Sequence, residues 1–296
     1  MSLSLKERDR RYSAIRELMG KGNMDCLVIA SRDSYSTRGN IRYVTNYGCY
    51  FGQEIVMFPI EGEPSIICSA QHAASIERGG WMNNVLPASG YHQRMSEELE
   101  QVKKELARLD KGNKIGIVGK SFISVPVYLA VEEQCPNRVI DAAEIFNQLR
   151  DIKSPEEIEA IRTAAVISDK VYIHIKNMLQ PGLTDFKIYG EAKALIHEMG
   201  CEYSMELGLP YGKVYGVNDM ASLEITPSYD GYYAQIPGSG MPVSGEYPPS
   251  MEKARSVWEE ALAAGVDTMR PGKTVSDVHQ TVSTTLRQHG DTHTAG

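Results

Sequence analysis

The residues of this chain whose types and spacing best suit chemistry are Glu224 and Gln235. Both lie in strand-like sequence, and Asp230-Gly231 between them is typical of a β-hairpin turn. By rough register Gln235 then faces Glu224 across the hairpin, where polar side chains on one face converge on a ligand. A carboxylate in that place binds a cation or acts as a general acid or base. The alternative, a solvent-facing glutamate on an edge strand, is equally compatible with the pattern.

Two other patterns suggest ligand sites and are incomplete. Gly116–Ser121 ends like a phosphate-binding P-loop, but Lys114 occupies the position that needs the first glycine, so we do not expect the backbone cradle. His289 and His293 have the spacing of helical metal ligands, but Gly290 interrupts the helix. We therefore expect neither nucleotide binding nor a self-contained metal site at these segments.

A repeat organises the second half of the chain. Met178–Thr184 is echoed by Thr268–Thr274, each copy carrying Pro-Gly between two helical patterns. The first copy continues beyond Gly200 into strand-like sequence, whereas six residues follow Gly290. A repeat without its strands leaves an apolar face uncovered, so we expect either a fragment of a longer protein or a decayed second half.

The first half alternates short apolar runs with helical patterns, which is typical of an α/β domain with helices covering a mixed sheet. The expected strands are 26–30, 55–60, 65–68, 114–118 and 139–140, and the expected helices begin near 5, 96 and 125. Ser154, Pro155 and Glu157 form a helix-start signal. The helix should run to Met178, with Ile158, Ile161, Ala165 and Tyr172 facing the core. We place the domain boundary there, giving domains 1–150 and 151–296.

Composition narrows the class of protein. The chain has 296 residues, 42% hydrophobic and 23% charged, which suits a soluble two-domain protein. Its net charge of −7 argues against nucleic acid or an anionic membrane as partner. The N-terminus has no apolar signal segment, and the five scattered cysteines suggest reduced, buried thiols, so we expect a cytoplasmic protein.

Several segments resemble the creatinase, prolidase and aminopeptidase P family. Asn40–Asn46 (NIRYVTN) resembles that family's NIRYLTG segment, and Leu149–Ile158 (LRDIKSPEEI) resembles its entry into the second domain. Both Pro-Gly helix pairs match as well. The resemblance implies a creatinase-type N-terminal α/β domain, followed by an α+β "pita-bread" domain that is incomplete because its second half-repeat lacks strands.

The resemblance also assigns the candidate site. In metal-dependent members, a D-x-G strand followed by G-Y-x-x-D supplies two aspartate ligands, which correspond here to Glu224 and Gln235, with Tyr232 in the Gly-Tyr. A neutral amide cannot bridge two cations. No histidine lies between His197 and His279, where the family's catalytic histidine is expected. We therefore expect Glu224, Gln235 and Tyr232 as catalytic residues, no metal site, and Mn, Co or Zn only if a longer protein supplies the missing ligands.

The implied function is an Xaa-Pro peptidase or creatinase-like hydrolase of a C–N bond in a proline-containing peptide or creatine-like amidino compound. As the chain stands, it should be metal-independent or inactive. A catalytically silent peptide- or protein-binding module is one alternative, and a metal-free hydrolase or lyase that uses Glu224 is another. Family members usually form homodimers in which the N-terminal domain covers the partner's site, which makes Arg38, Tyr43 or Tyr47 candidate substrate contacts. Packing within their own domain is the better-supported interpretation of these three.

Overall fold

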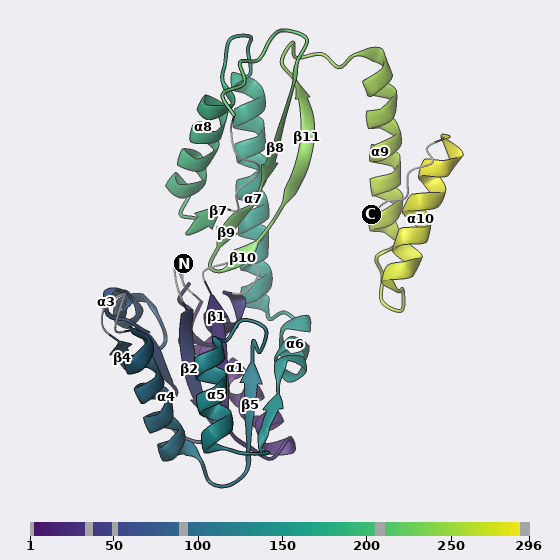
Figure 1. Cartoon of the computed structure of the whole chain (residues 1–296). Helices are drawn as coiled ribbons and strands as arrows, with labels where there is room; N and C mark the ends of the chain where they lie inside the picture. The colour runs from purple at the N-terminus through teal and green to yellow at the C-terminus, as the bar shows by residue number, and fades with distance from the viewer. Residues whose placement is uncertain (1–2, 33–37, 49–52, 89–93, 205–210, 291–296) are drawn as a thin grey trace. The chain divides into compact units, whose positions relative to one another are not determined.

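The computed structural model describes residues 3–32, 38–48, 53–88, 94–204 and 211–290 (Figure 1). Its N-terminal part is a mixed six-stranded sheet in the order β4-β3-β2-β1-β5-β6. Strand β1 pairs parallel to β5 and antiparallel to β2, so the mixed sheet expected from the sequence is confirmed. The strands are β1 Met24–Arg32, β2 Gln53–Pro59, β3 Ser65–Ser69, β4 Asn84–Ala88, β5 Lys114–Val118 and β6 Val139–Asp141.

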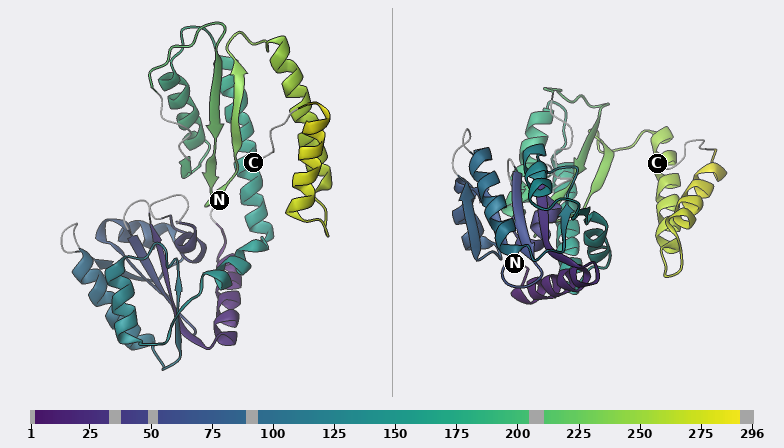
Figure 2. Two further views of the ribbon diagram at one scale, coloured as in Figure 1. Left: turned by 45° about the vertical axis from the view of Figure 1, so that its right-hand side comes forward. Right: turned by 60° about the horizontal axis from the view of Figure 1, so that its bottom comes forward.

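Helices cover both faces of this sheet (Figure 2). They are α1 Leu5–Lys21, α2 Gly39–Thr45, α3 Ala70–Gly79, α4 Arg94–Leu109, α5 Val125–Gln134 and α6 Ala143–Asp151. Alternate residues of β1 enter two separate cores: Leu27 and Ile29 pack with α1, α2 and α6, while Val28 packs with α4 and α5. A strand that is buried on both faces has a continuous run of apolar residues, which explains why β1 is easily predicted from the sequence.

Helix α7 (Pro155–Met178) begins at the predicted cap. The Ser154 N–H donates to Glu157 Oε2 at 2.6 Å, and the Glu157 N–H donates to Ser154 Oγ at 3.2 Å. The predicted core-facing stripe is wrong at two of its four positions, because Ile158 is 39% exposed and Ala165 is exposed. Ile161 and Tyr172 are partly buried. The buried stripe is Ala160, Ala164, Ile167, Val171 and Ile175. Since α7 carries apolar residues on several faces, its periodicity does not select the packed one.

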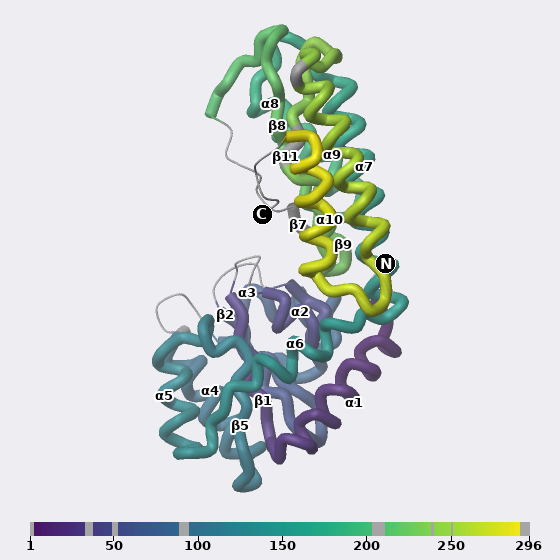
Figure 3. Tube along the Cα trace, turned by 90° about the vertical axis from the view of Figure 1, so that its right-hand side faces the viewer, coloured from purple at the N-terminus to yellow at the C-terminus, as the bar shows by residue number. Residues whose placement is uncertain are grey.

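Both helix pairs of the repeat are confirmed. Helix α8 (Asp185–Glu198) follows the first Pro-Gly, and α9 (Pro249–Thr268) and α10 (Val275–Gln288) flank the second. Helices α9 and α10 run side by side, with Gly265 against Val282 (Figure 3). Strands follow α8, namely β7 Tyr203–Ser204, β8 Met220–Ile225, β9 Pro227–Tyr229, β10 Tyr232–Tyr233 and β11 Ile236–Pro242. Within the described residues, which end at Gly290, no strand follows α10.

The chain divides into two compact units. Unit 1 contains Met1–His174, Gly190–Leu209 and Glu224–Pro237, and unit 2 contains Ile175–Tyr189, Pro210–Leu223 and Gly238–Gly296. The tip of the β8–β11 segment therefore belongs with the N-terminal sheet. The domain boundary at residue 150 stays a prediction.

Two further expectations concern cysteines and membranes. Cys26, Cys68, Cys135 and Cys201 are buried and form no disulfide, while Cys49 lies outside the described residues. None of the helices in the described part of the chain is both long and apolar enough to cross a bilayer.

Candidate functional site

The hairpin that carries the candidate site is built around Asp230-Gly231. Both residues have positive φ, 47° and 83°, and Tyr232 pairs with Tyr229 across them in antiparallel register. This is the two-residue turn that the Asp-Gly dipeptide predicts. Pro227–Tyr229, directly before the turn, is itself a short strand, β9.

Glu224 and Gln235 face each other as predicted. The Gln235 amide Nε2 donates a hydrogen bond to Glu224 Oε1. The neighbours of Glu224 along β8, Leu223 and Ile225, are 7% and 0% exposed, whereas Glu224 is partly exposed and Gln235 is exposed. The pair therefore lies on the open side of β8, where a bound molecule could reach the carboxylate. The catalytic roles of both residues stay predictions.

Tyr232, the third expected catalytic residue, is tied into a different set of contacts. Its hydroxyl donates to Glu157 Oε1 at 2.5 Å and accepts from Arg11 Nη2 at 3.0 Å. Burial raises the pKa of Tyr232 far above its usual range, so the phenol stays protonated. Neither Glu224 nor Gln235 is a hydrogen-bond partner of this hydroxyl. Tyr232 thus links the hairpin to α1 and α7, and its catalytic role is untested.

Two arginines from the N-terminal part hold the hairpin tip. Arg11 is 1% exposed and pairs with Glu7 at 2.7 Å and Glu157 at 3.2 Å. Arg42 forms a two-pronged ion pair with Glu202, at 2.8 and 2.5 Å, and its side chain packs against Gly231. Paired guanidinium–carboxylate contacts of this kind fix geometry as well as charge. Sequence reasoning missed both arginines, since nothing local marks them.

Of the three residues expected to reach a partner's substrate, Arg38 precedes α2, Tyr43 lies in it, and Tyr47 follows its end and is 8% exposed. Tyr43 is 4% exposed, its hydroxyl donates to the Leu149 carbonyl at 3.3 Å, and its ring stacks edge-on against Phe146. These contacts support packing within its own domain. Arg38 is the N-cap residue of α2 and is partly exposed. A substrate contact by any of these three residues stays a prediction.

The donor set at the hairpin does not fit a pair of metal ions. One carboxylate, Glu224, faces a neutral amide whose N–H group points at it, and an N–H donor repels a cation. Across the described residues no three His, Cys, Asp or Glu side chains are grouped so as to hold a metal. His289 contacts Glu260, with 3.0 Å between Nε2 and Oε2, and His293 lies outside the described residues.

Two family models together match nearly the whole chain. The model for the creatinase/prolidase N-terminal domain matches residues 11–152, and that for metallopeptidase family M24 matches residues 159–296. The chain belongs to the creatinase/prolidase family. Ectoine hydrolase from Halomonas elongata is 24% identical to this chain over an alignment 317 residues long. The alignment covers 95% of this chain and 76% of that protein.

Solved structures agree with this family assignment in fold. The X-Pro aminopeptidase from Thermotoga maritima has a TM-score of 0.79 at 17% identity, covering 94% of this chain and 78% of that one. The Xaa-Pro dipeptidase from Bacillus anthracis has a TM-score of 0.73 at 18% identity, covering 96% and 78%. The expected creatinase-type α/β domain followed by a pita-bread domain is therefore confirmed. At these identities the likeness concerns the fold alone.

Proposed function

We propose that this creatinase/prolidase-family chain hydrolyses a C–N bond of a small substrate, a proline-containing peptide or a creatine-like amidino compound, without a metal pair. The observation that carries the proposal is the Glu224–Gln235 pair on the open side of β8. An amide that donates to one carboxylate oxygen orients the other toward a ligand. A carboxylate held in this way suits a general base.

The chemistry assigns one role to each residue. Glu224 accepts a proton from a water molecule, whose oxygen attacks the carbonyl or amidino carbon of the substrate. The C–N bond then breaks, and the proton held by Glu224 passes to the leaving nitrogen. Gln235 orients Glu224 and needs no charge to do so. The name of the Halomonas elongata relative, ectoine hydrolase, supports a small non-peptide compound as one substrate class.

Replacing Glu224 with Gln tests the proposal. The wild-type chain is assayed on Ala-Pro, creatine and ectoine, in EDTA and with added Mn²⁺. We expect turnover of one compound in EDTA, its loss in Glu224→Gln, and wild-type turnover in Glu198→Gln, a matched change at an exposed glutamate of α8. Turnover in Glu224→Gln equal to wild type would contradict the role of Glu224, and turnover that requires Mn²⁺ would contradict metal independence.

The second candidate is a catalytically silent module that binds short peptides or a protein. The neutral amide at Gln235 and the lack of a three-residue metal group in the described chain favour it. Equilibrium dialysis with radiolabelled Ala-Pro separates the two. Binding that is saturable and leaves the dipeptide intact supports the module, whereas hydrolysis supports the enzyme.

We further propose a cytoplasmic homodimer, from the family's usual assembly and from the four described cysteines, which are buried and form no disulfide. Sedimentation equilibrium of the 296-residue chain should give a mass of twice 32.8 kDa. A mass of 32.8 kDa at all concentrations would contradict the dimer.

A further inference from the structure

The N-terminal sheet contains a crevice of the kind that binds ligands in other α/β proteins. Strands β1 and β5 are parallel neighbours. The helix that follows β1 is α2, and its Ile41 packs in the same core as α1. The helix that follows β5 is α5, and its Val127 packs with α4 in the core on the opposite face of the sheet. Connections that leave adjacent parallel strands toward opposite faces open a crevice beyond their carboxyl ends, which is where open α/β sheets bind ligands.

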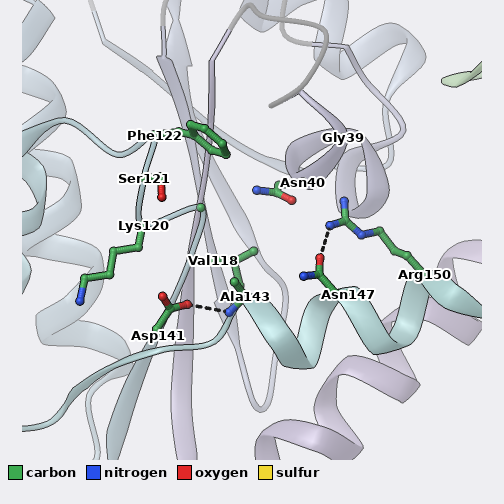
Figure 4. A pocket seen from close by; sticks show the side chains of 11 residues that line it. Gly39, Asn40, Val118, Lys120, Ser121, Phe122, Asp141, Ala143, Asn147 and Arg150 are labelled. Atoms are coloured by element: carbon green, nitrogen blue, oxygen red, sulfur yellow. Dashed lines mark hydrogen bonds between the residues drawn. The ribbon is translucent and has the colours of Figure 1, made fainter. Parts of the chain in front are cut away.

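A cavity of about 280 Å³ lies at this position (Figure 4). Its walls come from α2, from the segment that follows β5, and from β6 with α6. Its polar lining residues are Asn40, Lys120, Ser121, Asp141, Asn147 and Arg150. The volume is just below the roughly 300–1,000 Å³ of typical small-molecule sites, which suits a metabolite of a few carbons rather than a nucleotide.

Arg150 is the strongest indication of what the cavity binds. It is partly buried, and its hydrogen bond goes to a neutral acceptor, Asn147 Oδ1 at 2.7 Å (Figure 4). Burial lowers the pKa of Arg150. No carboxylate in the described part of the chain lies within ion-pair distance of its guanidinium. By contrast, Arg11, Arg42 and Arg138 each pair with at least one carboxylate.

A partly buried guanidinium stays charged and loses hydration free energy, so an oxyanion bound beside it would recover part of that cost. Lys120 adds a second positive charge, but its side chain extends away from Asn40 and Arg150, with Nζ 5.5 Å from the centre of the Tyr128 ring (Figure 4). Asp141 adds a negative charge and accepts from the Ala143 N–H, in the first turn of α6, at 2.9 Å. These three side chains carry a net charge of +1. Asn40, 9% exposed, and Ser121 supply neutral polar groups.

Phosphate recognition by the Gly119-Lys120-Ser121 segment is not supported by the local backbone. The N–H groups of Phe122 and Ile123 turn back onto the Gly119 carbonyl at 2.9 and 3.0 Å, and α5 begins only at Val125. A P-loop instead runs directly into its helix and aims successive N–H groups at the phosphates. The forked Arg150 guanidinium pairs with a carboxylate or a phosphate, so the backbone, which forms no phosphate cradle, is what favours the carboxylate.

We propose that this cavity binds a small carboxylic acid, whose carboxylate pairs with Arg150 and contacts Asn40 and Ser121. The site belongs to the N-terminal domain and is separate from Glu224 and Gln235, so it does not depend on the proposed hydrolase function. Its ligand is a monoanion or a short dicarboxylate of metabolite size, with Arg150 as the binding residue and Asn147 as its positioning residue.

Nuclear magnetic resonance of the ¹⁵N-labelled 296-residue chain tests the site. The Arg150 Nε–H signal and the backbone amides of Lys120 and Ser121 are followed during titration with sodium succinate, sodium phosphate and sodium chloride at constant ionic strength. We expect saturable shifts with succinate and a linear response to chloride. Saturation by phosphate with none by succinate would overturn the carboxylate assignment, and no saturable shift with either would overturn the site.

Variants separate a specific site from general electrostatics. Arg150→Gln should weaken succinate binding at least tenfold, whereas Arg162→Gln, at an exposed arginine of α7, should leave it unchanged. Equal weakening by both would overturn the proposal. Should Arg150→Gln fail to fold, Ser121→Glu serves as a second variant, because Ser121 is exposed and lines the cavity. The carboxylate it introduces should repel the ligand and weaken succinate binding at least tenfold. Unchanged affinity in Ser121→Glu would count against the site.

Discussion

The Tyr232 hydroxyl donates a 2.5 Å hydrogen bond to Glu157, two residues that lie 75 positions apart in the chain. Tyr232 is on the hairpin that carries Gln235, and Glu157 is in the first turn of α7. The same hydroxyl accepts from Arg11, so one phenol links the hairpin, α7 and α1. The placement of the candidate site therefore depends on a buried contact with the N-terminal part of unit 1.

Removing that hydroxyl should destabilise unit 1. Tyr232→Phe leaves buried Glu157 and Arg11 each with one partner fewer, which we expect to cost about 1.5–3 kcal/mol of unfolding free energy. Urea denaturation followed by circular dichroism measures the change. Tyr211→Phe, at a residue 88% exposed, is the matched control and should have no effect. Equal stability of the two variants would contradict the linking role.

The Arg42–Gly231 contact should make Gly231 intolerant of a side chain. A Cβ there would lie 2.8 Å from Arg42 Cγ, and the residue has a φ of 83°. Gly231→Ala should lower the unfolding free energy by more than about 2 kcal/mol, from backbone strain together with displacement of Arg42. Gly62 has a φ of 92° and open space around it. Gly62→Ala therefore measures the cost of backbone strain alone, about 1–2 kcal/mol of unfolding free energy. An equal loss of unfolding free energy in Gly62→Ala and Gly231→Ala would rule out a steric contribution from Arg42.

The Asp110–Arg138 pair predicts a pH dependence of stability. The Arg138 guanidinium, 2.5 and 2.6 Å from the two carboxylate oxygens, lowers the pKa of Asp110 to about 2. Because this folded-state pKa lies below the unfolded value of about 3.9, the stabilisation is complete above about pH 4 and is lost as pH falls through about 2.

Asp110→Asn should accordingly cost about 1 kcal/mol at pH 7, with a difference from wild type that shrinks between pH 4 and pH 2. Urea denaturation at a series of pH values measures this difference. Glu17→Gln, which breaks an exposed pair with Lys21, should leave stability unchanged at every pH. A difference for Asp110→Asn that stays constant with pH would contradict the prediction.

Gln235→Asp tests whether the amide is what excludes a cation. Two carboxylates facing each other on a hairpin repel, so we expect the variant to lose up to about 1 kcal/mol of unfolding free energy in EDTA. Millimolar Mn²⁺ should raise the melting temperature of Gln235→Asp and leave that of the wild type unchanged. Scanning calorimetry measures both. A wild-type melting temperature that rises equally with Mn²⁺ would contradict our interpretation of the donor set.

Local features of the fold were readable from the sequence. Strand β5 is predicted at 114–118 and forms there, the helix start at Ser154 is present, and the Asp-Gly turn adopts the conformation its residue types favour. Each depends on residues within a few positions of one another, so propensity and spacing suffice. The facing of Glu224 and Gln235 follows from the same turn.

Some elements escaped sequence reasoning because their patterns are not distinctive. The sequence did not indicate α2, α3, β4 or α6, whose short lengths give periodicity little room to show. The capping box whose residue types stand at Ser4 and Glu7, where the first helix is expected to begin, is half formed. Ser4 Oγ accepts from the Glu7 N–H at 3.2 Å, but the Glu7 carboxylate bonds Arg10 and Arg11, and the Ser4 N–H donates to Glu156 instead.

Residues near one another in the chain thus determine the turns, the helix caps, the buried strands and the Glu224–Gln235 pairing. Over such short separations, backbone geometry alone determines which groups meet. The packed face of α7, the buried Arg11–Glu157–Tyr232 network and the cavity beside Arg150 required the tertiary fold. Their members are separated by up to 221 residues, as in Arg11 and Tyr232. The free energy of burying a charge depends on which distant partner arrives, and no local pattern encodes that partner.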